Sequence, residues 1–319
     1  MSHVSPVELV LRARAPAKVN LVLRVGTRRP DGYHDLETLM VPLDLADEIL
    51  VRVVRGRRGP VTCRVPGRPE LDGPGNLAAR AAEALRRHLG VADRIDVTIE
   101  KRIPVTAGLG GGSSDAASVL RALARAYEVR KLSTLASAAL EVGSDVPFFL
   151  GQGPAWAAGR GELLTPARVP ALDLVLVYPK DPALAIRAGD AYQWLDAARR
   201  KGIAPAEALS SSHQEWSPAL ARNDLQGPCF ERHPTLETAA GDLVGQGATV
   251  AIMSGSGPTV FGIFPDRAAA RRTAAGAQEA GSGIEVHVAR TLQRHPGVSR
   301  WKSPKSGSSP SAKKSSRRT

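Results

Sequence analysis

The stretch that decides the fold reads Ile103-Pro104-Val105-Thr106-Ala107-Gly108-Leu109-Gly110-Gly111-Gly112-Ser113-Ser114-Asp115-Ala116-Ala117. Residues 94–100 before it alternate apolar and polar side chains, which predicts a half-buried strand, and the Ala- and Leu-rich residues 116–127 predict a helix. Glycine allows left-handed turns that bring backbone N–H groups against an anion, and a helix start adds partial positive charge. The stretch therefore predicts a phosphate-binding loop. Ser113 and Ser114 lie where the helix should begin, so one of them is expected to cap it and either can offer a hydroxyl to a phosphate or a metal.

This loop differs from the two common phosphate-binding signatures. It lacks the Gly-Lys-Ser/Thr ending of a P-loop, and it lacks the spacing and the later ribose-binding acid of a dinucleotide fold. A tight turn without a ligand is the alternative for a Gly-rich loop taken alone. Pro-x-x-x-Gly-Leu-Gly-Gly-Gly-Ser-Ser-Asp-Ala-Ala resembles the ATP loop of the GHMP kinases, the superfamily of galactokinase, homoserine kinase and mevalonate kinase. The triple Gly with Ser-Ser-Asp-Ala-Ala is most similar to the branch that phosphorylates a cytidine diphosphate ester of methylerythritol.

The composition is that of an ordinary globular protein. At 319 residues and 43% hydrophobic content, the chain should form one or two domains with sizeable cores. No apolar run approaches the roughly 20 residues of a membrane helix, and the N-terminus does not have a signal-peptide pattern. We therefore expect a soluble, cytoplasmic protein without a membrane partner. Cys63 and Cys229 stand alone, which predicts neither a disulfide framework nor a zinc site.

The net charge of +12 is unevenly distributed. After Thr291 there are eight basic residues and no acidic one, so about +4 remains for the rest of the chain. Residues 293–319 have too little apolar content to offset the entropy of ordering, and we expect a disordered basic tail. A solvated extension is the simpler interpretation. The alternative is a tail that touches nucleic acid or an acidic partner.

A lysine with small and apolar neighbours lies near the N-terminus. Residues 8–14 and 19–25 are predicted as two strands around Pro16, and the linking segment contains Lys18. A buried ammonium without a partner is costly, so Lys18 either snorkels to the surface or has a function. Pro-Ala-Lys-Val-Asn-Leu-x-Leu resembles the first motif of the same kinases. The resemblance implies that Lys18 is catalytic and that Asn20 binds substrate.

An aromatic and an imidazole ring follow a predicted turn at residues 30–32. Tyr33 can stack on a nucleobase and His34 can hydrogen-bond its edge, as proteins do with unstacked bases. The alternative is a Tyr packed under a loop with an exposed His. In the resembling kinases the Asp-Gly-Tyr-His element contacts cytosine, which homoserine, mevalonate and galactose lack.

An acidic residue follows a second predicted helix, residues 132–142, which Gly143 should end. Asp145 precedes a strongly apolar run, so its carboxylate should lie at the rim of a core. Taken alone it could be a cap or turn carboxylate. Gly-Ser-Asp-Val-Pro-Phe-Phe resembles the catalytic element of the same kinases, which implies that Asp145 is the base.

The second half carries a weaker signal and one departure from the family pattern. Residues 250–264 are predicted as strand, Gly-rich turn and strand, and Ser-Gly-Ser-Gly resembles the third GHMP motif, which closes over the phosphates. A plain hairpin would have the same sequence. The family usually has a Val-Ser-Thr-like segment ahead of a helical Tyr, whereas this chain has Ile186-Arg187-Ala188 before Tyr192.

The resemblance implies a two-domain α+β GHMP kinase fold, with a ribosomal-protein-S5-like ATP-binding domain over residues 1–160 and a ferredoxin-like domain over residues 161–292. The implied cofactors are ATP and Mg²⁺, with Ser114 as the candidate metal ligand. A helix is predicted to start at residue 76 with Asn76 as its cap, so capping explains Asn76, and solvent exposure explains Lys101, as well as ATP binding does. The residues implied to bind ATP are Asn76, Lys101, Pro104, Val105, Thr106, Ala107, Gly108, Leu109, Gly110, Gly111, Gly112, Ser113 and Ser114.

The implied reaction converts ATP and 4-(cytidine 5′-diphospho)-2-C-methyl-D-erythritol, a small-molecule substrate, to ADP and the 2-phosphate, a step of the non-mevalonate isoprenoid route. Another GHMP kinase acting on homoserine or mevalonate is the first alternative, and it would need no base site. A basic nucleic-acid-binding protein is the second. We expect a monomer or a weak homodimer.

Overall fold

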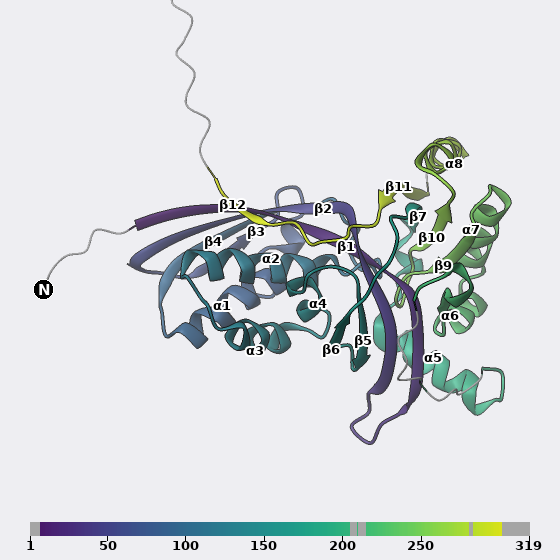
Figure 1. Ribbon diagram of the computed structural model, residues 1–319, viewed down its shortest axis with the longest axis horizontal. Coiled ribbons are helices and arrows are strands. Elements are labelled where there is room, and N and C mark those ends of the chain that lie inside the picture. The colour runs from purple at the N-terminus through teal and green to yellow at the C-terminus, as the bar shows by residue number, and fades with distance from the viewer. Residues whose placement is uncertain (1–6, 205–208, 210–214, 281–282, 302–319) are drawn as a thin grey trace, which may run out of the picture.

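Two long antiparallel strands, β1 (Val7–Arg28) and β2 (His34–Arg58), run through the whole molecule (Figure 1). The computed structural model describes residues 7–204, 209, 215–280 and 283–301. The prediction of two strands around Pro16 was wrong, because β1 continues through this proline. A register shift between Pro16 and Lys18 interrupts the β1–β2 ladder there, and such a bulge accommodates a residue that has no N–H to donate.

The first sheet has the strand order β12-β1-β2-β4-β3, with β5 attached to β2, β6 attached to β5 and β8 attached to β1. Two helices pack against this sheet and two more pack on those helices, and all four lie together below the sheet in Figure 1. Their small and branched side chains form one core with the sheet. The strands are β3 (Val61–Arg64), β4 (Asp93–Glu100), β5 (Ala155–Gly159), β6 (Leu163–Pro166), β8 (Arg222–Asn223) and β12 (Val298–Arg300), and the helices are α1 (Leu77–Leu89), α2 (Gly111–Ala126), α3 (Leu132–Val142) and α4 (Val146–Leu150).

The second sheet is antiparallel with the order β11-β7-β10-β9. Its β-α-β-β-α-β sequence and its order of fourth, first, third and second strand are those of the ferredoxin-like fold, as expected. Its strands are β7 (Asp173–Pro179), β9 (Val250–Met253), β10 (Val260–Phe264) and β11 (Ile284–Arg290). Its helices are α5 (Ala188–Arg200), α6 (Gln226–Arg232), α7 (Pro234–Gly245) and α8 (Arg267–Ala280), and 3-10 turns occur at Pro69–Leu71, Pro182–Leu184 and Pro218–Leu220.

Helix α2 begins earlier than the sequence predicted. It starts at Gly111, inside the Gly-rich stretch, and its N-cap is Gly110 with φ 69°. No side chain caps it, so the prediction of a serine cap was wrong. A left-handed glycine turns the chain into the helix instead, and the free N–H groups of the first turn face away from the helix body. By contrast, Asn76 caps α1 as predicted, because its side chain accepts a hydrogen bond from the Ala78 N–H.

Part of the predicted tail is ordered. Strand β12 pairs with β1 with Leu11 opposite Arg300 and Ala13 opposite Val298. Residues 293–301 therefore belong to the folded part, and residues 302–319 lie outside the described residues. The β5–β6 hairpin belongs to the first sheet and crosses the domain boundary predicted after residue 160.

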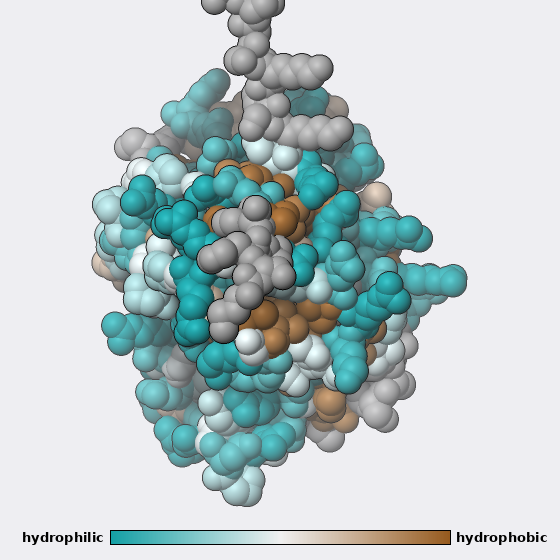
Figure 2. Space-filling view, turned by 90° about the vertical axis from the view of Figure 1, so that its left-hand side faces the viewer, coloured by the Kyte–Doolittle hydropathy of each residue, from teal (hydrophilic) through white to brown (hydrophobic). Residues whose placement is uncertain are grey.

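The surface around the α1 end of the molecule is largely polar, with apolar residues gathered near its centre (Figure 2). Within the described residues, no helix is both long and apolar enough to cross a bilayer.

Candidate active site

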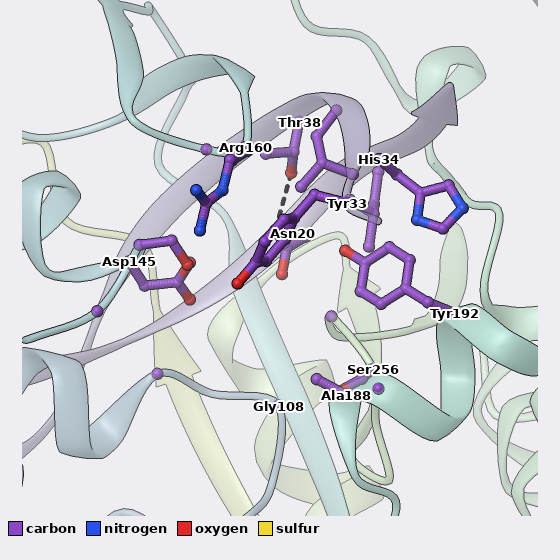
Figure 3. Close-up of a pocket in the computed structure, with 18 of the residues that line it drawn as sticks. Asn20, Tyr33, His34, Thr38, Gly108, Asp145, Arg160, Ala188, Tyr192 and Ser256 are labelled. Atoms are coloured by element: carbon purple, nitrogen blue, oxygen red, sulfur yellow. Dashed lines mark hydrogen bonds between the residues drawn. The ribbon is translucent and has the colours of Figure 1, made fainter. Parts of the chain in front are cut away.

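Two cavities meet at the start of α2. The strand cavity, about 580 Å³, is lined mainly by β1, β2, α5 and the residues around Asp145 (Figure 3). The loop cavity, about 560 Å³, is lined by residues 70–72 and 75–77, Lys101 and the Gly-rich loop. Gly108, Gly110 and Ser113 line both. A group at these three residues is therefore accessible from either side.

Only glycine fits at position 108 of this junction. Gly108 has φ 73°, and a Cβ there would lie 2.2 Å from the Ser254 carbonyl oxygen. The turn between β9 and β10 closes on the loop at this point, because the Ser254 hydroxyl donates to the Gly108 carbonyl at 3.1 Å. The Thr259 N–H donates to the Ala107 carbonyl at 3.4 Å. The Ser-Gly-Ser-Gly turn thus packs against the Gly-rich loop.

Lys18 is buried beside this junction. The residue is only 4% exposed. Its Nζ donates a hydrogen bond to the Asn20 Oδ1 at 2.6 Å, and its backbone N–H donates to the Leu109 carbonyl at 2.9 Å. Burial lowers the pKa of Lys18, and the charge of Asp145 partly opposes that shift. The structure therefore places the two predicted catalytic residues in the lining of one cavity, although 127 positions separate them in the chain.

Asn20 is held by a chain of hydrogen bonds that runs away from the lysine. Its Nδ2 donates to the Thr38 Oγ1 at 2.8 Å, and that hydroxyl donates to the Val22 carbonyl at 2.7 Å (Figure 3). This fixes the Asn20 amide oxygen toward the ammonium. Thr38 was missed from the sequence, because nothing in a run of strand residues marks which one faces a neighbour's amide.

Asp145 precedes α4 at the wall of the strand cavity. Its side chain is half-buried and makes no capping hydrogen bond. The carboxylate therefore remains available to a ligand. It also contributes, after burial, to raising the pKa of the Tyr192 hydroxyl, which lines the same cavity.

The end of the strand cavity away from Asp145 is lined by aromatic side chains (Figure 3). The ring of His34 stacks on Tyr192 with 5.3 Å between centroids and 19° between planes, and its Nε2 lies 2.9 Å from the Asp196 Oδ1. Tyr33 is 52% exposed and its ring stands in the cavity (Figure 3). Tyr192 was anticipated only as a helical family residue. Its contact with His34 depends on how α5 packs against β2, which one sequence does not reveal.

Lys101 lies beneath the loop between two buried carboxylates. Its Nζ donates to the Asp47 Oδ2 at 2.5 Å and to the Asp115 Oδ2 at 2.9 Å. Burial lowers the pKa of Lys101, but the two carboxylates outweigh this effect and the net shift is upward. A Cβ on Gly111 would lie 3.2 Å from the Nζ, so the ammonium is close to the start of α2.

Asp115 and Asp47 should differ in their effects on stability. Burial, reinforced by the charge of Asp47, raises the pKa of Asp115 to about 8 against the effect of Lys101. An acid whose folded pKa exceeds its unfolded value of about 3.9 binds more protons when folded, so its contribution to the free energy of unfolding falls as the pH rises between these values. Asp115→Asn removes this pH-dependent contribution to the free energy of unfolding. Relative to wild type, the variant should gain stability as the pH rises from about 4 to about 8 in urea unfolding.

Asp47→Asn is the matched comparison. The Asp47 Oδ1 accepts the backbone N–H groups of Arg102 at 2.5 Å and Ile103 at 2.9 Å while Oδ2 holds Lys101. Breaking this buried pair should cost about 3 to 5 kcal/mol. A tolerated Asp47→Asn, or an Asp115→Asn that loses stability as the pH rises, would contradict this assignment.

The remaining predicted residues divide into two groups. Asn76, Lys101 and residues 104–108 and 110–113 line the loop cavity. Leu109 and Ser114 are buried and line neither cavity, and the Ser114 Oγ has no hydrogen-bond partner among the described residues. Ser113 lines both cavities instead. Across the described part of the chain, no three His, Cys, Asp or Glu side chains are grouped so as to hold a metal ion.

Each half of the chain contains a segment that matches a kinase family model. Residues 76–153 match the GHMP kinases N terminal domain, and residues 193–283 match the GHMP kinases C terminal domain. A crystal structure of homoserine kinase from Cytophaga hutchinsonii is similar with a TM-score of 0.62 over 94% of this chain and 99% of that chain, at 17% identity. The fold is thus that of a GHMP kinase.

More similar proteins define the family within that class. A 4-diphosphocytidyl-2-C-methyl-D-erythritol kinase of Anaeromyxobacter dehalogenans is 65% identical over 309 residues, which cover 96% of this chain and 98% of the relative. A crystal structure of 4-(cytidine 5′-diphospho)-2C-methyl-D-erythritol kinase has a TM-score of 0.67 and 35% identity, covering 88% of this chain and 98% of that chain. The chain belongs to the 4-diphosphocytidyl-2-C-methyl-D-erythritol kinase family.

Proposed function

We propose that this protein transfers the γ-phosphoryl group of ATP to the 2-hydroxyl of 4-(cytidine 5′-diphospho)-2-C-methyl-D-erythritol, in the non-mevalonate route to isoprenoid precursors. One observation carries the proposal. The loop cavity and the strand cavity share Gly108, Gly110 and Ser113, with Lys18 and Asp145 on the strand side. A donor in one cavity and an acceptor in the other would meet at this junction.

ATP fits the loop cavity by its chemistry. The first turn of α2 offers free backbone N–H groups, and the left-handed Gly108 and Gly110 keep side chains away from the space in front of them. Mg²⁺ neutralises phosphate charge when it is bound. Because the described residues provide no cage of acidic ligands, we expect phosphate oxygens and water to coordinate most of it, with Ser113 as the loop hydroxyl at the junction.

Lys18 and Asp145 have distinct tasks in this reaction. Phosphoryl transfer needs an aligned hydroxyl and stabilised charge more than covalent help from the protein. Asp145, whose carboxylate makes no capping hydrogen bond, would orient the acceptor hydroxyl and take its proton. Lys18, fixed by Asn20 at 2.6 Å, would stabilise negative charge on the transferring group and keep the carboxylate ionised.

The aromatic end of the strand cavity suits a pyrimidine. Tyr33 offers an exposed ring face, and Tyr192 stacks on His34, whose Nε2 contacts the Asp196 carboxylate at 2.9 Å. That contact leaves the other imidazole nitrogen for the edge of a base. Homoserine and mevalonate contain no ring that could use these groups, so this end of the cavity favours a nucleotide-linked alcohol.

The test is a kinase assay that compares the cytidine diphosphate substrate with homoserine and mevalonate. Turnover is expected with the first alone. Tyr33→Ala should raise the KM for that acceptor about 10-fold, because aromatic stacking on one base contributes about 1 to 3 kcal/mol. Trp301→Ala is the matched control, since Trp301 is an exposed aromatic that lines neither cavity. Turnover of homoserine or mevalonate, or an unchanged KM in Tyr33→Ala, would refute the assignment.

A further inference from the structure

Arg160 lies in a glycine-flanked turn that faces the strand cavity. The turn joins β5 to β6, and both neighbours, Gly159 with φ 67° and Gly161 with φ 107°, have left-handed backbones. The guanidinium carbon of Arg160 lies 3.7 Å from the centroid of the Tyr33 ring. In Figure 3 the side chain points from the turn into the cavity, toward Tyr33 and the side that carries Asp145.

The charge of Arg160 contributes, after the Tyr33 N–H and Arg29, to lowering the pKa of Asp31, but it forms no ion pair with that carboxyl. Among the described residues no acidic side chain forms an ion pair with it, and the neighbouring Glu162 instead accepts the backbone N–H of Arg160 at 2.7 Å. Arg29, in the turn of the β1–β2 hairpin, does form ion pairs, with Asp31 at 3.0 Å and with Asp35 at 2.9 Å. The acids of the hairpin are therefore already engaged. Arg160 retains donors for a ligand in the cavity.

The proposed substrate has an anionic group that suits this position. Its diphosphate joins the base to the sugar alcohol, so it must lie between the group that stacks on the base and the group that meets the hydroxyl. Arg160 is in contact with Tyr33, at the base end, and its side chain extends toward the Asp145 side of the cavity. A planar guanidinium donates paired hydrogen bonds to phosphate oxygens and stacks on an aromatic face at the same time.

We propose that Arg160 binds the diphosphate of the acceptor while it stacks on Tyr33, and so selects nucleoside diphosphate acceptors. This inference rests on the proposed function. It assigns Arg160 to substrate binding and gives it no part in the chemical step. Removal of its charge should weaken the binding of phosphorylated cytidine compounds and leave the binding of cytidine itself almost unaffected.

The experiment compares Arg160→Gln with wild type. Hydrogen bonds to charged groups contribute about 1.5 to 3 kcal/mol, so the KM for the acceptor should rise at least about 10-fold, with kcat and the KM for ATP within about twofold. By calorimetry, the Kd for CDP should rise by a similar factor, while the Kd for cytidine should change less than about twofold. Arg160→Lys should recover part of the loss because it restores the charge.

Arg168→Gln is the matched control, since Arg168 is exposed, lies eight positions along the chain and lines neither cavity. Equal losses for CDP and cytidine in Arg160→Gln would mean that Arg160 only supports Tyr33, and would overturn the inference. So would an unchanged KM in an active enzyme. A wild-type protein that does not turn over the acceptor would instead refute the proposed function, and the two failures are therefore distinguishable.

Discussion

Replacement of Asp145 by Asn is expected to lower kcat at least about 100-fold while the Kd for ATP stays within about twofold. The amide cannot take a proton from the acceptor hydroxyl, yet it has nearly the same shape. Asp145 lines the strand cavity and not the loop cavity, so ATP binding should not depend on it. Single-turnover kinetics and a separate ATP titration measure the two quantities.

Asp190→Asn is the control for this experiment. Asp190 is an acid in the first turn of α5, close in the chain to the cavity residues 188 and 189, but it lines neither cavity. Its replacement should leave turnover within about twofold, as surface changes usually do. Near-normal turnover of Asp145→Asn would remove Asp145 from the role of base.

Lys18→Met is expected to lower kcat by about 10² to 10³, the loss usually seen when one charge-stabilising group is removed from an active site. The methionine fills most of the buried volume but cannot stabilise the transferring phosphoryl group. Lys18→Arg should not restore activity, because the backbones of Gly110 and Gly255 lie close to the lysine side chain and leave little room for the wider guanidinium. A Cβ on Gly110 would lie 3.0 Å from the Lys18 Cγ, and one on Gly255 would lie 3.2 Å from its Nζ.

Combination of the two replacements tests whether the residues act as a unit. The charge of Asp145 raises the pKa of Lys18 against the effect of burial, so Asp145→Asn should lower that pKa further. Because residues that act together show strongly non-additive losses, the double variant should be about as slow as the slower single variant. Losses that multiply would mean that Lys18 and Asp145 contribute independently.

Much of the fold could be predicted because its strongest signals are local. The Asn76 cap, the end of α3 at Gly143 and the β9–β10 hairpin depend on a few neighbouring residues, and each forms as expected. The continuous β1 could not be foreseen, because Pro16 signals a break in any local pattern. Pairing with β2 along nearly its whole length keeps the strand intact.

The site was predictable only as separate motifs. Lys18 and Asp145 were assigned by resemblance, and they come to one cavity because α4 packs against α2 and places Phe149 beside Gly110. The acids that surround Lys101 carry no local signal, since Asp47 reads as an ordinary polar residue on a strand. Arg160 was also missed, because an arginine between two glycines has the same sequence as a solvent-exposed turn.

The most direct test is a crystal structure with a non-hydrolysable ATP analogue and the cytidine diphosphate acceptor. The γ-phosphate should lie at Gly108, Gly110 and Ser113, and the 2-hydroxyl should lie within about 3.2 Å of the Asp145 carboxylate, with Lys18 beside the transferring group. An acceptor hydroxyl turned away from Asp145, or triphosphate bound outside the loop cavity, would contradict the proposed transfer between the two cavities.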